Sequence, residues 1–142
     1  ISGMSANEST LVILGIVVFL VLFWTGILFV VAETSGWRRM ARQYGMDGEF
    51  AGEKWEGERG YMRWAAFRGM LTAGANKEGL YLKIQAPFHF FCRPLFIPWK
   101  VIRVEAKRQW SVDGVVFHLG TQQPVEFWVH ESMAEKLREA SL

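Results

Sequence analysis

An uninterrupted apolar run near the N-terminus, residues 11–32, constrains this chain more than any other feature. Its 22 residues, LVILGIVVFLVLFWTGILFVVA, include no charged residue and no proline. As a helix that rises about 1.5 Å per residue, the run would extend roughly 33 Å, enough to cross a hydrocarbon core of about 30 Å. The sequence therefore predicts one transmembrane helix, with a short extracytoplasmic tail of residues 1–10 before it.

The charges that flank the run predict its orientation. Glu8 is the only charged residue before it, whereas Arg38, Arg39 and Arg42 follow it closely. Because cytoplasmic flanks carry the excess of Lys and Arg, we expect the N-terminus outside and the C-terminal part in the cytoplasm. A signal peptide cleaved after residues 30–32 is the alternative, but no basic segment precedes the run, which exceeds the roughly 7 to 15 apolar residues of signal peptides.

Two glycines and one tryptophan suggest that the predicted membrane helix packs against a partner. Gly15 and Gly26 are eleven residues apart, so they share one stripe of the helix with Leu22, where a second helix has room to approach. Trp24 lies near the middle of the run, where its indole N–H has no water to bind. Either a partner helix or cofactor accepts a hydrogen bond from it, or the free-energy cost of the unsatisfied donor is tolerated. Glycine is also common in membrane helices without any partner. The run contains no His, Met or Cys, so we expect no haem-type cofactor on it.

A short amphipathic helix is predicted in residues 33–45, directly after the membrane run. Apolar residues recur there at helical spacing, and the arginines lie on the opposite face. We expect this helix on the cytoplasmic membrane surface, with its arginines on anionic lipid and its aromatic rings at headgroup level. A simple stop-transfer anchor is the alternative. The predicted membrane-interface residues are Trp37, Arg38, Arg39, Arg42 and Tyr44.

The following segment, residues 46–60, has the composition of a linker. Four of its fifteen residues are glycine and seven are charged. Phe50 and Trp55 are the only aromatic residues in it. We therefore expect a linker, or a loose first edge of the domain that follows.

From residue 61 onward the hydrophobic pattern changes to the period of two that is typical of strands. Alternating segments are predicted within residues 63–73, 80–85, 95–97, 102–107, 110–112, 115–119 and 125–129. We expect a turn at residues 76–79 and a two-residue hairpin turn at Asp113-Gly114. These segments predict six or seven short antiparallel strands.

A helix is predicted at the C-terminus of the chain. Ser132 and Glu135 have the spacing of a capping box, and Met133 and Leu137 recur on one helical face. Residues 61–142 are therefore predicted to form a small mainly-β domain, an antiparallel barrel or sandwich closed by an amphipathic helix.

This order of elements resembles that of pleckstrin-homology-like (PH-like) and GRAM-like barrels. The sequence GLYL at residues 79–82, followed by IPW at residues 97–99 and by Ile102, is similar to a pattern in small bacterial single-pass membrane proteins of uncharacterised function. The resemblance implies a PH-like or GRAM-like domain in which Gly79 serves a turn and Pro98-Trp99 a corner. The basic phosphoinositide-binding hairpin of some PH domains is not matched, because Lys77 is followed by Glu78.

Aromatic residues are concentrated between the prolines of residues 87–98. Ordinary core packing is one interpretation of this concentration. The other is an exposed aromatic loop beside Arg93 and Lys100 that contacts a partner protein or the bilayer surface. The residues of this predicted contact loop are Phe88, Phe90, Phe91, Phe96 and Trp99.

Catalytic and metal-binding motifs are absent from the sequence. His89, His118 and His130 are widely spaced, and no CxxC, HExxH, GxSxG or P-loop pattern occurs. Cys92 is the only cysteine and forms no internal disulfide, which suits a reducing cytoplasm. A net charge of +2 is too small to indicate nucleic-acid binding. We therefore expect no enzymatic activity, metal, cofactor or nucleic-acid partner.

These features favour a non-catalytic accessory subunit of a larger inner-membrane complex, for which photosynthetic and respiratory assemblies are natural hosts. Its single helix would pack on integral-membrane subunits while the cytoplasmic domain braces their surface. The alternative is a membrane-tethered lipid- or ligand-binding module that acts on its own. A self-associating scaffold is a third hypothesis.

Overall fold

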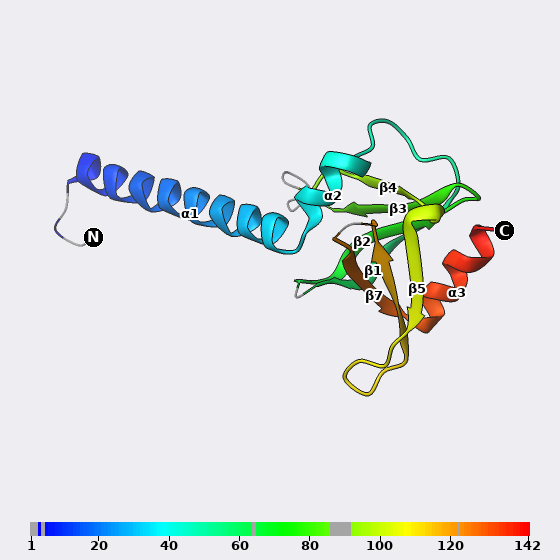
Figure 1. The fold of residues 1–142 in the computed structure, drawn as a ribbon. Helices are drawn as coiled ribbons and strands as arrows, with labels where there is room; N and C mark the ends of the chain where they lie inside the picture. Colours follow the sequence, from blue (N-terminus) through cyan, green and yellow to red (C-terminus); the bar gives the residue numbers. More distant parts are fainter. Residues whose placement is uncertain (1–2, 4, 64, 86–91, 122) are drawn as a thin grey trace.

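The computed structural model of the chain describes residues 3, 5–63, 65–85, 92–121 and 123–142. A long helix, α1 (Ala6–Thr34), projects from a β-domain, and α2 (Trp37–Tyr44) follows it at the edge of that domain (Figure 1). At the start of α1 the Ser5 and Glu8 side chains each accept a hydrogen bond from the other residue's backbone N–H. The helix is long and apolar enough to cross a membrane, and almost none of its apolar stretch is buried.

Seven antiparallel strands form one curved, nearly closed sheet in the order β4-β3-β2-β1-β7-β6-β5. The strands are β1 (Glu53–Met62), β2 (Ala65–Ala75), β3 (Gly79–Ile84), β4 (Leu95–Pro98), β5 (Ile102–Ala106), β6 (Gly114–Leu119) and β7 (Val125–His130). Strands β1–β4 and β5–β7 form two meanders, which join where Tyr61 pairs with Trp128 and Met62 with Phe127. The C-terminal helix α3 (Glu131–Ala140) packs against β2, β6 and β7. The prediction of a mainly-β domain with a C-terminal helix is therefore confirmed.

The core lies inside the curved sheet and beneath α3. Alternate residues of β3 and β7 point into it, as the period of two predicts. Most residues that the sequence pattern placed inward are buried, namely Leu80, Leu82, Ile84, Val125, Phe127, Val129, Met133 and Leu137. Ala134 and Ala140 of α3, also expected inward, are half-buried. Burial of these side chains supplies the main favourable term that holds the sheet and α3 together.

Of the two expectations for residues 46–60, the linker is wrong, whereas a first edge of the domain agrees with the strand found there. Strand β1 begins at Glu53, which pairs with Ala75 of β2. Phe50 is buried, with its ring stacked on that of Tyr81 at a centroid distance of 4.6 Å. The polar composition of this segment reflects a strand with one solvent-facing side and a register irregularity near Gly57, whose φ is +68°. The domain therefore begins before residue 61.

The hairpin between β5 and β6 turns at Trp110-Ser111 and not at Asp113-Gly114 as predicted. Gln109 and Val112 pair on either side of the turn. Trp110 and Ser111 have φ values of +51° and +62°, the left-handed conformation that a type I′ turn requires at both central positions. Because neither residue is Gly, Asn or Asp, composition alone did not indicate this turn.

Helix α3 begins at Glu131, so the predicted capping box at Ser132 was also wrong. The N-cap is His130, whose Nδ1 accepts a hydrogen bond of 3.1 Å from the Ser132 backbone N–H. The His130 imidazole therefore caps the helix N-terminus, a role that the sequence pattern assigned to the Ser132 hydroxyl.

Candidate membrane-facing surface and ligand groove

The surface of α1 carries the predicted packing residues on two opposite faces. Gly15, Leu22 and Gly26 follow one stripe, and a Cβ added at either glycine would meet no atom within 4 Å. Trp24 is nine residues from Gly15, which is about 2.5 helical turns, so it lies on the other side. Among the described residues the Trp24 indole N–H has no hydrogen-bond acceptor, and 56% of the residue is exposed. One partner helix therefore cannot contact both features.

Trp37 is part of the domain core, so its assignment to the membrane interface was wrong. The residue is fully buried, and its ring meets that of Phe67 edge to face at a centroid distance of 5.8 Å. Its indole N–H donates a hydrogen bond of 2.7 Å to the backbone carbonyl of Arg93. Tyr44, at the other end of α2, is half-buried and packs against the same core. The apolar face of α2 thus covers protein and not lipid.

The joint between α1 and α2 is packed into the domain as well. Ala32 and Ser35 are fully buried, and Gly36 makes the bend with a φ of +87°. A side chain at Gly36 would press against Val125 of β7, with the added Cβ only 3.1 Å from a methyl group. The end of α1 is therefore fixed to the β-domain by buried contacts and not by a flexible tether.

The arginines after α1 remain on the surface, as predicted. Arg38 and Arg42 both pair with Glu33, at N–O distances of 3.0 and 3.6 Å. Arg39 donates two hydrogen bonds to Gln123, of 2.9 Å to the side-chain oxygen and 2.7 Å to the backbone carbonyl. Glu33 thus holds Arg38 and Arg42 beside the last turn of α1, and Gln123 holds Arg39.

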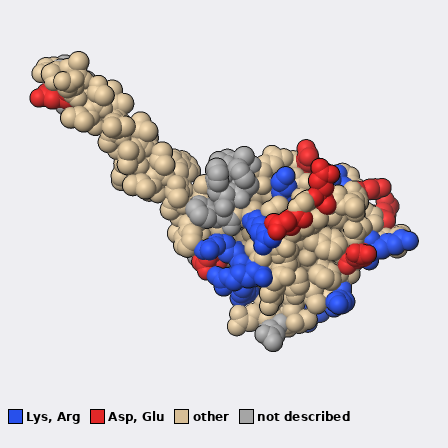
Figure 2. All heavy atoms as spheres, turned by 90° about the horizontal axis from the view of Figure 1, so that it is seen from above, with Lys and Arg blue, Asp and Glu red and all other residues tan. Residues whose placement is uncertain are grey.

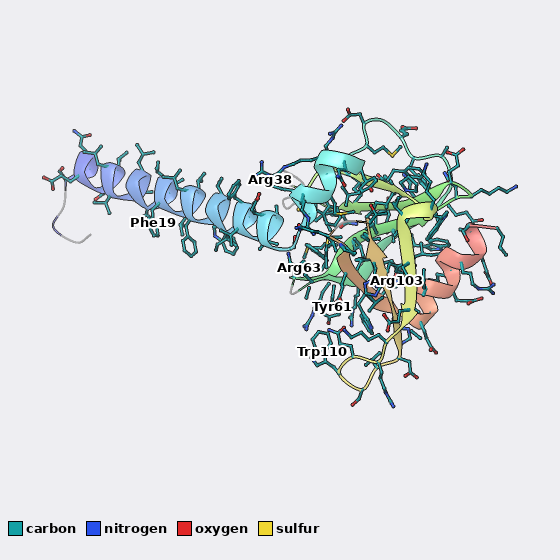
Figure 3. All side chains as sticks on the ribbon, viewed as in Figure 1. Phe19, Arg38, Tyr61, Arg63, Arg103 and Trp110 are labelled. Atoms are coloured by element: carbon teal, nitrogen blue, oxygen red, sulfur yellow. The ribbon has the colours of Figure 1, made fainter. Side chains whose placement is uncertain are left out.

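A fourth arginine extends this positive area. Arg63, in the turn between β1 and β2, shares a surface hollow of about 460 Å³ with Arg39 and Glu126. Figure 2 shows Lys and Arg side chains gathered on the part of the domain nearest to α1, and Figure 3 places Arg38 and Arg63 on that side. We call Arg38, Arg39, Arg42 and Arg63 the juxtamembrane basic surface.

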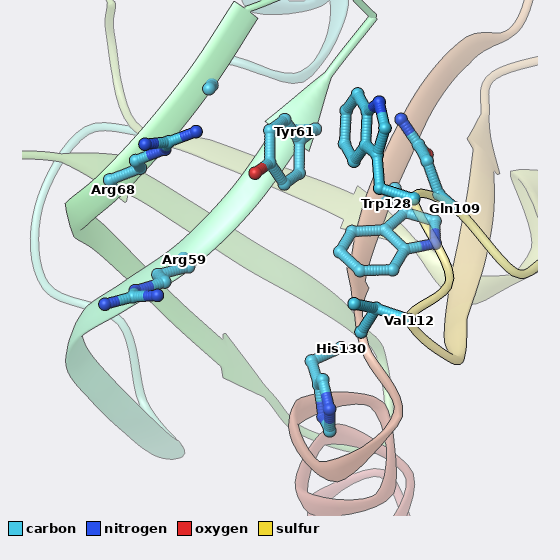
Figure 4. A pocket seen from close by; sticks show the side chains of 9 residues that line it. Arg59, Tyr61, Arg68, Gln109, Val112, Trp128 and His130 are labelled. Atoms are coloured by element: carbon cyan, nitrogen blue, oxygen red, sulfur yellow. The ribbon is translucent and has the colours of Figure 1, made fainter.

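A larger open groove lies on the outside of the sheet where β1 meets β7 (Figure 4). Its volume is about 600 Å³, within the range of roughly 300 to 1,000 Å³ that is typical of small-molecule sites. Strands β1 and β2, strand β7 and the β5–β6 hairpin line it. We call it the Trp110 groove; its principal side chains are Arg59, Tyr61, Arg68, Trp110, Trp128 and His130.

Three aromatic rings form one side of the Trp110 groove. The Tyr61 ring lies 4.8 Å from that of Trp110 and 5.6 Å from that of Trp128, centroid to centroid. The Trp128 indole N–H donates a hydrogen bond of 2.9 Å to the backbone carbonyl of Lys107, which ties β7 to the hairpin. Gly114 makes room for this indole, because an added Cβ would overlap with its ring.

Positive charge borders the other side of the groove. Arg59 and Arg68 are exposed, and no ion pair or side-chain hydrogen bond involves either one within the described part of the chain. His130, at the end of β7, accepts a hydrogen bond at Nδ1 from the Ser132 backbone N–H, which fixes its ring at the border of the groove. The sequence did not indicate this site, because Arg59 lies in residues 46–60, whose composition is that of a linker or of a loose first edge of the domain. The alternation of Arg59 and Tyr61 with the buried Gly60 and Met62 was the available signal.

The predicted aromatic contact loop is only partly described. Phe88, Phe90 and Phe91, together with His89, lie outside the described residues. Phe96 packs near Phe50, with ring centroids 6.0 Å apart. The Trp99 indole N–H donates a hydrogen bond of 2.8 Å to the Asn76 carbonyl. For Phe96 and Trp99 the structure thus shows packing on their own domain and not an exposed loop.

Titratable groups in the described residues do not assemble a metal site. No group of three or more His, Cys, Asp or Glu side chains lies close enough to hold a metal ion within this part of the chain. His118 is 3.0 Å from Glu105 across β5 and β6. Cys92 is buried, and its burial raises the pKa of the thiol to about 12, so the thiolate nucleophile is scarce.

Comparisons with known proteins identify no family for this chain. The chain matches no protein-family model, no curated protein and no solved structure. Its function is therefore argued from the three surfaces above: α1, the juxtamembrane basic surface and the Trp110 groove.

Proposed function

We propose that this chain is a membrane-tethered, non-catalytic binding module, in which α1 spans a bacterial inner membrane and the cytoplasmic β-domain rests on anionic lipid. The observation that carries the proposal is the buried joint at Ala32, Ser35 and Trp37. A domain fixed to the last turn of a membrane helix has its nearest surface at headgroup depth. Here that surface is the juxtamembrane basic surface.

The charge balance at this level favours lipid binding. Glu33 offsets one of the four arginines of the juxtamembrane basic surface and Glu126 is paired with Lys107, which leaves a net charge of about +3 at the interface. Each basic residue near an anionic leaflet contributes about 1 kcal/mol of attraction. This attraction supplements the hydrophobic anchoring by α1, and it orients the domain on the membrane.

The strand order with a closing C-terminal helix supports a PH-like or GRAM-like identity for the domain. We assign no catalytic role to it, because the buried Cys92 and the separated histidines form no reactive constellation among the described residues. Fold alone conveys no ligand, so the lipid contact is argued from the arginines and the joint.

Hydrogen–deuterium exchange of the full chain in lipid nanodiscs tests the lipid contact. We would compare discs of phosphatidylcholine alone with discs that also contain phosphatidylglycerol. The readout is the difference in exchange between the two lipids for the amides of α2 and for those near Gly120 and Gln123. Slower exchange in the anionic discs, lost at high salt, is the expected result.

Matched variants separate this surface from general electrostatics. Arg39→Gln combined with Arg63→Gln should remove the lipid-dependent difference, whereas Arg103→Gln, on the more distant strand β5, should retain it (Figure 3). Equal exchange in neutral and anionic discs for the unmodified chain would contradict the proposal. So would an equal loss in the Arg103 variant.

Trp24 favours a second candidate function, the accessory subunit of a photosynthetic, respiratory or other integral-membrane complex. Its indole N–H lies near the middle of α1 and finds no acceptor among the described residues. An unsatisfied donor in hydrocarbon is costly, and an acceptor on a neighbouring subunit would remove that cost. The open stripe of Gly15 and Gly26 offers a separate contact on the opposite face of α1.

Solubilisation of native membranes in mild detergent, followed by a native gel and mass spectrometry, tests this candidate. Trp24→Leu and the pair Gly15→Leu with Gly26→Leu would each be compared with Ile16→Leu, a change about a quarter turn away from both the glycine stripe and Trp24. Migration in a large complex that either test variant releases would support an accessory subunit. Migration alone would exclude it, and a small oligomer of this chain would indicate a self-associating scaffold.

A further inference from the structure

The Trp110 groove carries positive charge that the domain does not balance. Arg59 and Arg68 flank the pair Gly60 and Phe67 on the neighbouring strands β1 and β2. Like charges side by side on adjacent strands are destabilising. No Asp or Glu is among the described residues that line the groove, and neither arginine has an ion pair there. An anion bound at this end would offset the repulsion.

The rest of the groove presents aromatic faces. Figure 4 shows Tyr61 with the two arginines on one side of it and Trp128, Gln109 and Val112 on the other. The Trp110 ring completes the wall, and 67% of this residue is exposed to solvent. Aromatic groups of a ligand can stack on such rings, offset or edge to face.

The hairpin that carries Trp110 is held in a demanding conformation. Trp110 and Ser111 both have left-handed backbone angles, which non-glycine residues rarely adopt. Contacts with Tyr61 and the hydrogen bond from Trp128 to Lys107 hold this arrangement against the sheet. The groove is therefore formed before any ligand arrives, which reduces the cost of binding.

We propose that the Trp110 groove binds a planar aromatic anion, a small molecule whose ring system carries a carboxylate or phosphate group. The acidic group lies between Arg59 and Arg68, where guanidinium groups bind oxyanions in a bidentate manner. The ring system extends over Tyr61 towards the two indoles. This site is separate from the juxtamembrane basic surface, and the inference does not depend on lipid binding.

Titration of the full chain with naphthalene-2-carboxylate tests this site. The protein would be held in nanodiscs of uncharged phosphatidylcholine, with empty discs as the reference for partitioning into lipid. The readout is the NMR signal of each indole N–H, assigned by replacing each tryptophan with phenylalanine. We expect saturable shifts for Trp110 and Trp128 and none for Trp99, which lies outside the groove.

A neutral analogue and three variants isolate the contributions of the charge and the rings. The neutral analogue 2-naphthamide should bind about tenfold more weakly than the carboxylate. The double variant Arg59→Gln with Arg68→Gln should lower the affinity for the carboxylate by about tenfold or more. Trp110→Ala should also lower the affinity for the carboxylate, and the variant should still fold because this side chain is mostly exposed. Arg103→Gln, an equal loss of charge outside the groove, should leave the affinity within about twofold.

Three results would overturn the proposal. The first is the absence of a saturable shift at Trp110 and Trp128 up to the solubility limit of the probe. The second is equal affinity for the acid and the amide, which would show that the arginines do not bind the ligand. The third is unchanged affinity in the Arg59 and Arg68 double variant. Because the discs are uncharged, none of these results would bear on binding to anionic lipid.

Discussion

The indole N–H of Trp37 donates a 2.7 Å hydrogen bond to the backbone carbonyl of Arg93, 56 residues later in the chain. This contact links the first helix after the apolar span to the segment that leads into β4. The Met46 backbone N–H adds a second link, a hydrogen bond of 2.7 Å to the Pro94 carbonyl. The folding unit therefore begins at the end of α1 and not after a linker.

Replacing Trp37 should destabilise the domain strongly. Trp37→Ala removes a fully buried ring and leaves the Arg93 carbonyl without its donor, so the free energy of unfolding should fall by about 3 to 5 kcal/mol. Trp37→Phe retains most of the packing and should cost less, about 1 to 3 kcal/mol. Denaturant unfolding of the full chain in detergent micelles would measure both values.

Trp110→Ala is the matched control, because it removes the same side chain from an exposed position. Its effect on unfolding should stay below about 1 kcal/mol. If Trp37→Ala lowered the free energy of unfolding no more than Trp110→Ala, the contacts described at the joint between α1 and the domain would be contradicted.

Fragments of the chain should show where the folding unit begins. A fragment of residues 46–142 lacks Ala32, Trp37 and Met40 of the core and should fail to fold. A fragment of residues 32–142 retains them and should give a dispersed NMR spectrum. A well-dispersed spectrum from the shorter fragment would show that α2 is dispensable, contrary to this structure.

The course of most strands was predictable because their inward faces are regular. Leu80, Leu82 and Ile84 alternate with polar or half-polar neighbours, and this period of two required no tertiary information. β1 was missed because its inward positions near the C-terminal end are Gly60 and Met62, and its earlier part is charged. Only pairing with β2 makes this segment a strand.

The position of Trp37 shows a different limit of sequence reasoning. An amphipathic helix after a membrane span has the same apolar stripe whether it covers lipid or its own domain. The choice depended on Phe67 and on the Arg93 carbonyl, which are distant in sequence. The Trp110 groove was unpredictable for the same reason, since it depends on the pairing of β1 with β7 at Tyr61–Trp128 and Met62–Phe127, which are distant in sequence.

Gly114→Ala should disturb the Trp110 groove from beneath. The added methyl group would overlap with the Trp128 indole and displace it from the Lys107 carbonyl. We expect a loss of about 1 to 3 kcal/mol in stability, and a shift in the NMR signal of the Trp128 indole N–H.

A double-mutant cycle checks the cause of that loss. Trp128→Leu removes the ring that the methyl group meets, so Gly114→Ala should cost much less in this background. An equal cost in both backgrounds would place the strain elsewhere in the hairpin.

Cys92 should be inert in the folded chain and should make stability depend on pH. Burial raises the pKa of its thiol from 9.0 to about 12, so the folded state holds this proton more tightly than the unfolded state. The associated stability is fully present below about pH 9 and decreases as the pH rises towards 12. Maleimide at neutral pH should modify Cys92 only after denaturation, and rapid labelling of the folded chain would contradict its burial.

The inertness of Cys92 allows a test of the proposed membrane topology. Asn7→Cys places an exposed thiol before α1, and Lys77→Cys places one in the turn before β3. With the N-terminus outside, a membrane-impermeant maleimide should label position 7 in intact bacterial spheroplasts and position 77 only after permeabilisation. The basic residues Arg38, Arg39 and Arg42 predict this orientation because positive charge remains on the cytoplasmic side. The unmodified chain, with Cys92 alone, is the control. Labelling of position 77 in intact spheroplasts would reverse the orientation and would remove the cytoplasmic leaflet as the surface beneath the domain.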